Sequence, residues 1–148
     1  LYTYWKRTIL PPHMQIFNAA GREMCSMRQE STNTPMQALA ILNDPTFVEA
    51  ARFLGQRMIL EGGERSDDRV RYGFRLLMAH APNPTKEKVL LNALNDYQTH
   101  YIRHQQDAKQ LLSVGDSRSR ADIPEPELAA YTMLASVLLN MDEAITRD

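Results

Sequence analysis

Two histidines in a helical stretch of the sequence have a spacing that can hold a metal ion. His100 and His104 are four residues apart, so on one helix their side chains project from the same face. The zinc-protease pattern requires a glutamate directly after the first histidine, where this chain has Tyr101. Because no third histidine or cysteine is near in sequence, we expect two surface or half-buried histidines, and a metal-binding pair is the weaker alternative.

The only cysteine, Cys25, is flanked by Arg22 and Arg28, whose positive charge would favour a thiolate. As a nucleophile it would need a histidine base, and His13 is the only histidine in the same segment. The competing interpretation, which we favour, is a small buried hydrophobic side chain or a thiol whose partner lies in a missing region. One cysteine excludes an internal disulfide, and the absence of CxxCH excludes covalent haem attachment within this sequence.

A third group of polar residues brackets one short helical segment: Asn33, Gln37, Asn43 and Asp44. Amide and carboxylate groups of this kind suit sugar hydroxyls, so the four residues form a candidate polar binding surface, with a glycan as a candidate ligand. The same side chains suit helix capping and the anchoring of an N-terminal segment, which is the commoner use of such residues.

Carboxylates in two separate parts of the chain raise the question of glycosidic acid–base chemistry, which requires two carboxyl groups at a defined separation. The candidates are Asp44, Glu49, Asp142 and Glu143, with Arg147 beside the last two. Sequence does not give the separation, and charge pairs at helix ends are the more common result. We therefore assign no catalytic residue.

The candidate residues lie on or beside predicted helices, which are indicated by helical periodicity and by a recurring helix-start motif. Thr34-Pro35, Asp44-Pro45 and Asn83-Pro84 each combine a capping side chain with a proline at the first helical position. Apolar residues then recur at steps of three and four, and in the first short helix they are Met36, Leu39, Ala40 and Leu42. We predict helices over Pro35–Asn43, Pro45–Glu61, Asp67–His80, Pro84–Leu112 and Glu127–Met141.

These elements predict an all-α fold, an irregular N-terminal arm packed on an antiparallel bundle of about five helices. The arm spans residues 1–31 and the helical domain residues 32–148, as one structural domain. The last helix is apolar nearly all round, which is typical of a central core helix. Short connections favour antiparallel neighbours. In the arm, Trp5 is expected to contact a partner outside this sequence.

Composition excludes several classes of protein. The chain has 148 residues, a formal net charge of −1, 43% hydrophobic residues and 24% charged residues. The sequence lacks the overall positive charge that is typical of proteins that bind nucleic acid. No apolar run approaches the roughly 20 residues that span a bilayer. The first residues, Leu-Tyr-Thr-Tyr-Trp, include neither a Met start nor a signal peptide. We therefore expect a piece of a longer protein.

Several motifs occur together and in order along nearly the whole chain. They are LYTYWKRTILPP at the start, REMC at 22–25, TNTPMQAL at 32–39, LNDP at 42–45, FVEAAR at 47–52, and the C-terminal ELAAY and LLNMDEAITR. The set resembles the C-terminal uncharacterised domain of the large planctomycete cytochrome-c-type proteins (PSCyt/PSD). The resemblance implies a long secreted or periplasmic parent with another uncharacterised domain upstream. It also implies that any haem c belongs to that parent, and it suggests a link to glycan metabolism.

Three hypotheses of function follow. The first is a non-catalytic helical module that packs on the upstream domain and helps to form a binding surface. The second is half of a polysaccharide-related hydrolase site completed by that domain, and the third is an electron-transfer partner that docks the cytochrome module. A deep polar cleft lined by Asn33, Gln37 or Asp44 would favour the hydrolase, whereas a flat apolar seam would favour the packing module. The sequence gives neither ligand nor oligomeric state.

Overall fold

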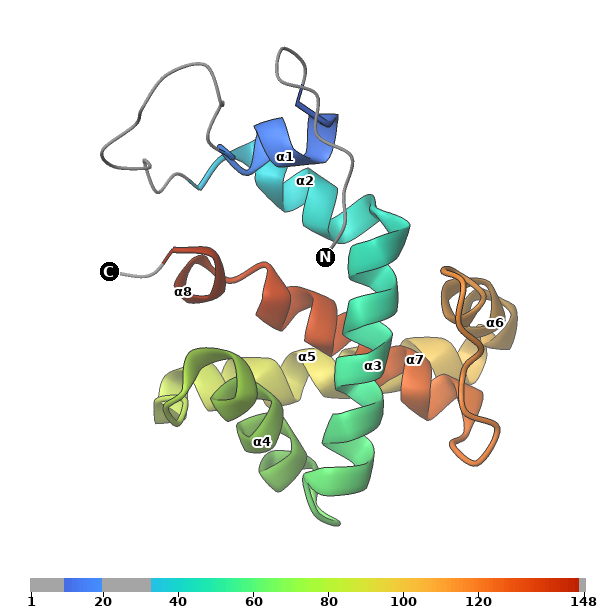
Figure 1. Cartoon of the computed structure of the whole chain (residues 1–148). Helices are drawn as coiled ribbons and strands as arrows, with labels where there is room; N and C mark the ends of the chain where they lie inside the picture. The colour runs from blue at the N-terminus through green and yellow to red at the C-terminus, as the bar shows by residue number, and fades with distance from the viewer. Residues whose placement is uncertain (1–9, 20–32, 147–148) are drawn as a thin grey trace.

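The fold is described by a computed structural model over residues 10–19 and 33–146. This part of the chain contains eight helices and no strand, so the predicted all-α class is confirmed (Figure 1). The helices are α1 (Pro12–Ile16), α2 (Pro35–Asn43), α3 (Pro45–Glu61), α4 (Ser66–Met78), α5 (Pro84–Arg103), α6 (Gln105–Leu112), α7 (Glu125–Leu139) and α8 (Asp142–Ile145). The predictions for Cys25, Trp5 and Arg147 lie outside the described residues.

The three predicted capping sites all begin helices. Thr34 and Gln37 form a reciprocal capping box at α2, in which each side chain accepts a hydrogen bond from the other residue's backbone N–H. The Asp44 carboxylate accepts from the Thr46 N–H at 2.8 Å and starts α3. Asn83 accepts from the Lys86 N–H at 2.7 Å and starts α5. A proline follows each cap, so local sequence alone sets these three starts.

Helix α7 is the centre of the core, as its all-round apolar sequence predicts. Tyr131, Leu134 and Leu138 are fully buried in it, and it packs most extensively against α3 and α5. Helix α3 runs across α7 instead of lying along it (Figure 1). Gly55 lies at this crossing, where an added Cβ would come within 3.0 Å of the α7 backbone at Tyr131 and Thr132.

The predicted helix Pro84–Leu112 is interrupted in the structure. His104 has φ −120° and ψ 65°, which ends α5, and α6 begins at the next residue. The change of direction lets Ala108 and Leu112 bury against the core, where α6 packs on α7. No glycine or proline marks this break, so the sequence pattern does not reveal it.

Other helix boundaries also differ from the prediction: α4 begins one residue early at Ser66, α7 ends two residues early at Leu139, and the short helix α8 follows it. Pro12 begins the short helix α1 inside the expected irregular arm, because its fixed φ suits a first helical position. Helix α4 ends at Met78, two residues early, because Ala79 adopts a left-handed conformation with φ 62°. Helix α7 starts at Glu125, with Pro126 in its first turn. Among the described helices, none has both the length and the hydropathy to cross a membrane.

Candidate functional site

Gln37, one of the four predicted polar candidates, is buried, with 2% of its surface exposed. Its side-chain Nε2 donates to the Ile16 carbonyl at 2.9 Å, and its Oε1 accepts from the Thr34 N–H at 2.8 Å. The amide thus joins the segment that contains α1 to α2. In this conformation Gln37 serves the chain's own backbone.

The other three polar candidates also contact neighbouring parts of the chain. Asn33 donates to the Asp142 carboxylate at 2.8 Å and so ties the start of α2 to α8. Asn43 donates to the Leu39 carbonyl one turn earlier, at 2.8 Å. Asp44 caps α3. The four residues therefore surround α2, as the sequence suggests, and the interactions found here are those of caps and anchors.

The candidate carboxylates are paired with partners on different elements. Glu143 of α8 forms an ion pair with Lys86 of α5, and Asp142 accepts from Asn33. Glu49 lies on α3, where it binds Arg52 and a loop described below. Each of these carboxylates thus interacts with a different residue of the chain. None of these contacts brings two of the carboxylates together as a catalytic acid–base pair.

The predicted histidine pair does come together. The rings of His100 and His104 stack with centroids 4.5 Å apart and an interplanar angle of 25°. His104 Nδ1 lies 3.0 Å from the His100 carbonyl, and His100 Nε2 lies 3.6 Å from an Asp107 carboxylate oxygen. All three side chains are exposed. Within the described residues, no group of three or more His, Cys, Asp or Glu side chains is placed to hold a metal.

A buried arginine on α3 makes the most extensive set of polar contacts in the described chain. Arg52 is 1% exposed. Its Nη1 donates to the carbonyls of Leu112 and Val114, at 2.5 and 3.1 Å, and its Nη2 donates to the Ser117 carbonyl at 2.7 Å. These contacts engage both terminal nitrogens of a charge that would otherwise be unfavourable in the interior, while the buried Nε has no partner in the described part of the chain.

Glu49, one turn before Arg52, completes this arrangement, which we name the loop clamp. Its carboxylate lies 3.4 Å from Arg52 Nη2 and accepts from the backbone N–H groups of Ser117 and Asp116, at 2.9 and 3.2 Å. Hydrogen bonds from Ser117 and then Asp116 lower the pKa of Glu49 below its ordinary value, because they stabilise the ionised form. The clamp therefore fixes the start of the loop between α6 and α7 against α3.

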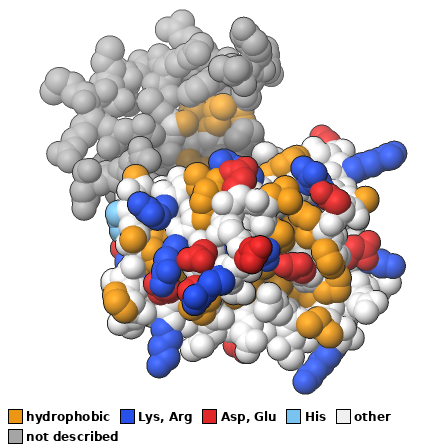
Figure 2. Space-filling model, turned by 90° about the horizontal axis from the view of Figure 1, so that it is seen from below, with side chains coloured by type: hydrophobic (Ala, Val, Ile, Leu, Met, Phe, Trp, Pro, Cys, Tyr) orange, Lys and Arg blue, Asp and Glu red, His pale blue; other side chains and the backbone are white. Residues whose placement is uncertain are grey.

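Charged side chains on the rest of the described surface are mostly paired. Arg71 of α4 pairs with Glu87 of α5 at 2.7 Å, and Arg69 of α4 pairs with Glu127 of α7 at 2.8 Å. On the face in Figure 2, acidic and basic side chains are interspersed. On this face the described side chains therefore form no extended field of one sign, the kind of field by which proteins attract nucleic acid.

Helix α2 exposes large apolar side chains. Met36, Leu39 and Leu42 are 58%, 56% and 43% exposed. We name these three residues the α2 apolar surface. The apolar stripe predicted for this helix therefore faces outward, because Gln37 and Ile41 occupy the inner side.

An apolar cavity of about 340 Å³ lies beside Ile41 of α2. The described residues that line it are all apolar and come from five helices and the residue after α1: Phe17, Ile41, Phe47, Leu77, Leu139, Ala144 and Ile145. The rings of Phe17 and Phe47 lie 5.7 Å apart and connect the residue after α1 to α3. This end of the fold is therefore an apolar seam.

Comparison with models of protein families gives a match for this chain. Residues 1–94 match the model of PSD1, a protein of unknown function (DUF1553). The chain belongs to the PSD1 family. No curated protein and no solved structure matches it.

The PSD1 match spans α2 and both clamp residues on α3, whereas the backbone that the clamp holds lies beyond residue 94. Arg52 is the residue that the sequence analysis does not single out, because it occurs there only within the FVEAAR motif. On the same side of α3 it has the apolar Val48 four residues earlier but the polar Gln56 four residues later, so helical periodicity does not mark it as buried. Its burial follows from the structure alone.

Proposed function

We propose that this PSD1 chain is a non-catalytic packing and binding module of a longer secreted or periplasmic polypeptide. The upstream domain of that polypeptide would pack on the α2 apolar surface. The observation that carries the proposal is the reversed polarity of α2, in which Gln37 is buried while Met36 and Leu39 are more than half exposed. A helix gains stability when its apolar face is covered, and exposed apolar patches commonly mark sites of interaction.

The composition of α2 supports an apolar partner. Its sequence, PMQALAILN, contains no charged residue. Complete burial of a large apolar side chain contributes about 1.5–3 kcal/mol, and three such side chains are available here. Covering them would therefore contribute substantially to a domain interface.

The polar groups around α2 favour the packing module over a hydrolase half-site. Asn33, Gln37 and Asp44 hydrogen-bond to the chain itself, and the nearby cavity is apolar. A catalytic half-site would need polar side chains directed towards a substrate. The proposal also includes a secreted location, an upstream domain and a haem c elsewhere in the parent. These three features rest on the sequence resemblance alone.

A pair of lysine substitutions tests the proposal in the longer polypeptide. Leu39→Lys places a charge on the α2 apolar surface, and Val89→Lys places one on α5 at a similar exposure, 61% against 56%. In this chain alone, both variants should unfold at the temperature of the wild type. In the longer polypeptide, Leu39→Lys should split the calorimetric unfolding transition into one transition for this module and one for its neighbouring domain, whereas Val89→Lys should not.

The outcomes separate the hypotheses. If Leu39→Lys leaves unfolding of the parent unchanged, the α2 apolar surface is not the domain contact and the proposal is wrong. If both variants have the same effect in the parent, the loss reflects added charge and not a specific interface.

A further inference from the structure

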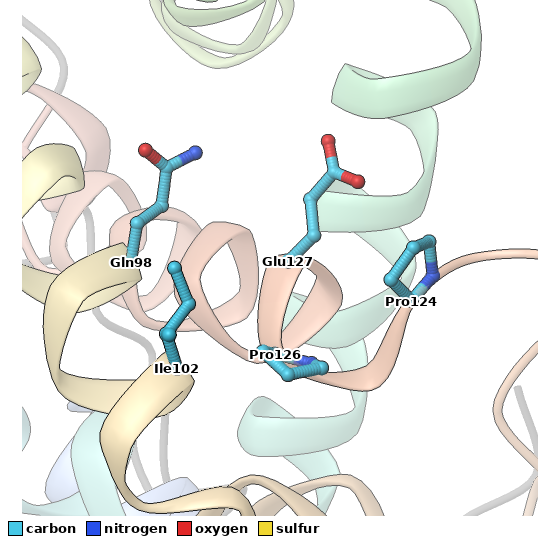
Figure 3. Close-up of a pocket in the computed structure, with 5 residues that line it drawn as sticks. All are labelled: Gln98, Ile102, Pro124, Pro126 and Glu127. Atoms are coloured by element: carbon cyan, nitrogen blue, oxygen red, sulfur yellow. The ribbon is translucent and has the colours of Figure 1, made fainter.

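A groove between α5 and the start of α7 has two polar side chains, Gln98 and Glu127, beside apolar residues. It has a volume of about 420 Å³. The residues around it are Gln98 and Ile102 of α5 with Pro124, Pro126 and Glu127 (Figure 3). This volume lies within the range of roughly 300–1,000 Å³ found for ligand sites.

The two polar side chains stand at one rim of the groove. Figure 3 shows the Gln98 carboxamide and the Glu127 carboxylate extending in the same direction from α5 and α7, with Ile102 below Gln98 and Pro126 below Glu127. Glu127 Oε1 accepts from Arg69 at 2.8 Å, which leaves Oε2 as an acceptor. Gln98 makes no hydrogen bond or ion pair within the part of the chain that the structure describes, so both its donor and its acceptor are available.

The charges and the wall restrict the chemistry of an occupant. Arg69 offsets the charge of Glu127, so the pair gives the groove no net charge and does not favour an ion. The two prolines have no backbone N–H to donate, and the polar side chains around the groove are those of Gln98 and Glu127. Ile102 is 64% exposed and offers an apolar contact.

We infer that this groove binds an uncharged peptide segment with an aliphatic side chain. One peptide unit has both groups that the rim requires: its N–H donates to Glu127 Oε2, and its carbonyl accepts from the Gln98 amide. The aliphatic side chain then covers Ile102 and the two prolines. This site is separate from the α2 apolar surface and does not depend on the proposed function.

Nuclear magnetic resonance with capped single amino acids tests this inference on the chain itself. N-acetyl-leucine methylamide should give saturable shifts of the Gln98 side-chain amide and the Ile102 methyl groups. N-acetyl-glycine methylamide should bind about tenfold more weakly, because it lacks the apolar side chain. Ile102→Ser should weaken leucine-derivative binding several-fold, whereas Val89→Ser, on the same helix and equally exposed, should not.

Each other outcome would overturn the inference. Shifts that do not saturate, or that saturate at residues away from the groove, would show that no peptide site exists there. Equal affinity for the glycine and leucine derivatives would remove the role of Ile102. Tighter binding of N-acetyl-lysine methylamide or methyl glucoside would instead identify a site for cations or for sugars. The spectrum of each variant shows whether it is folded.

Discussion

Gly115 lies against Glu49 so closely that an added Cβ would come 2.6 Å from the carboxylate oxygen Oε2. Gly115 also has φ +96°, a conformation that other residues rarely adopt. The loop clamp therefore depends on a glycine at the point where the backbone turns beneath Glu49. This contact connects α3 to a loop more than 60 residues later in the sequence.

The first prediction compares two glycines with nearly the same positive φ. Gly115→Ala adds strain and a clash with Glu49, whereas Gly63→Ala adds strain alone, since its nearest neighbour would be 3.7 Å away at φ +94°. The strain should lower the free energy of unfolding by about 1–2 kcal/mol in each variant, with a further loss for Gly115→Ala. Urea unfolding measures both, and equal losses would contradict the close contact.

The second prediction concerns the buried arginine. Arg52→Met leaves three carbonyls and the Glu49 carboxylate without their donor, and should lower the free energy of unfolding by about 3–5 kcal/mol. Arg57→Met, which removes an exposed ion pair with Glu61 on the same helix, should have little effect. If Arg52→Met does not fold, Arg52→Lys should show faster hydrogen exchange at Ser117. Unchanged exchange there would rule out the clamp.

The third prediction is a pH dependence. The pKa of Glu49 is lowered in the folded chain, so its contribution is fully present above the unfolded carboxyl pKa of about 4.3. That contribution disappears as the pH falls through the lower folded pKa. The wild type should therefore be more stable than Glu49→Gln at neutral pH, and the difference should shrink on acidification. A difference independent of pH would exclude this role of the carboxylate.

The fourth prediction is that His100 and His104 bind no zinc tightly. His104 Nδ1 contacts the His100 carbonyl, and the described residues place no third ligand with them to complete a metal site. Elemental analysis of protein purified without an affinity tag measures this directly. Stoichiometric zinc that is lost in His104→Ala would prove the prediction wrong.

Local signals allowed much of this fold to be predicted. Capping residues followed by proline set the starts of α2, α3 and α5, and the apolar sequence of α7 indicated its central position. The break at His104 could not be predicted, because it results from the packing of α6 on α7 and not from a helix-breaking residue.

The candidate site was harder to predict than the helices. Periodicity placed Met36 and Leu39 together on one side of α2, but only the tertiary contact of Gln37 with Ile16 decides which side faces inward. The partners of Arg52 lie about 60 residues away in sequence, and no local pattern connects them. In both cases a hydrogen bond to a residue distant in sequence accompanies the burial of a polar side chain, and such a partner cannot be found from local sequence.

Oxidative footprinting of Met36 tests the proposed packing role most directly. Met36 is 58% exposed on the α2 apolar surface, whereas Met58 is fully buried and is the internal control. The account predicts that Met36 is oxidised rapidly in this chain and is protected several-fold in the longer polypeptide, with Met58 protected in both. Equal oxidation of Met36 in the two would contradict a domain contact at α2.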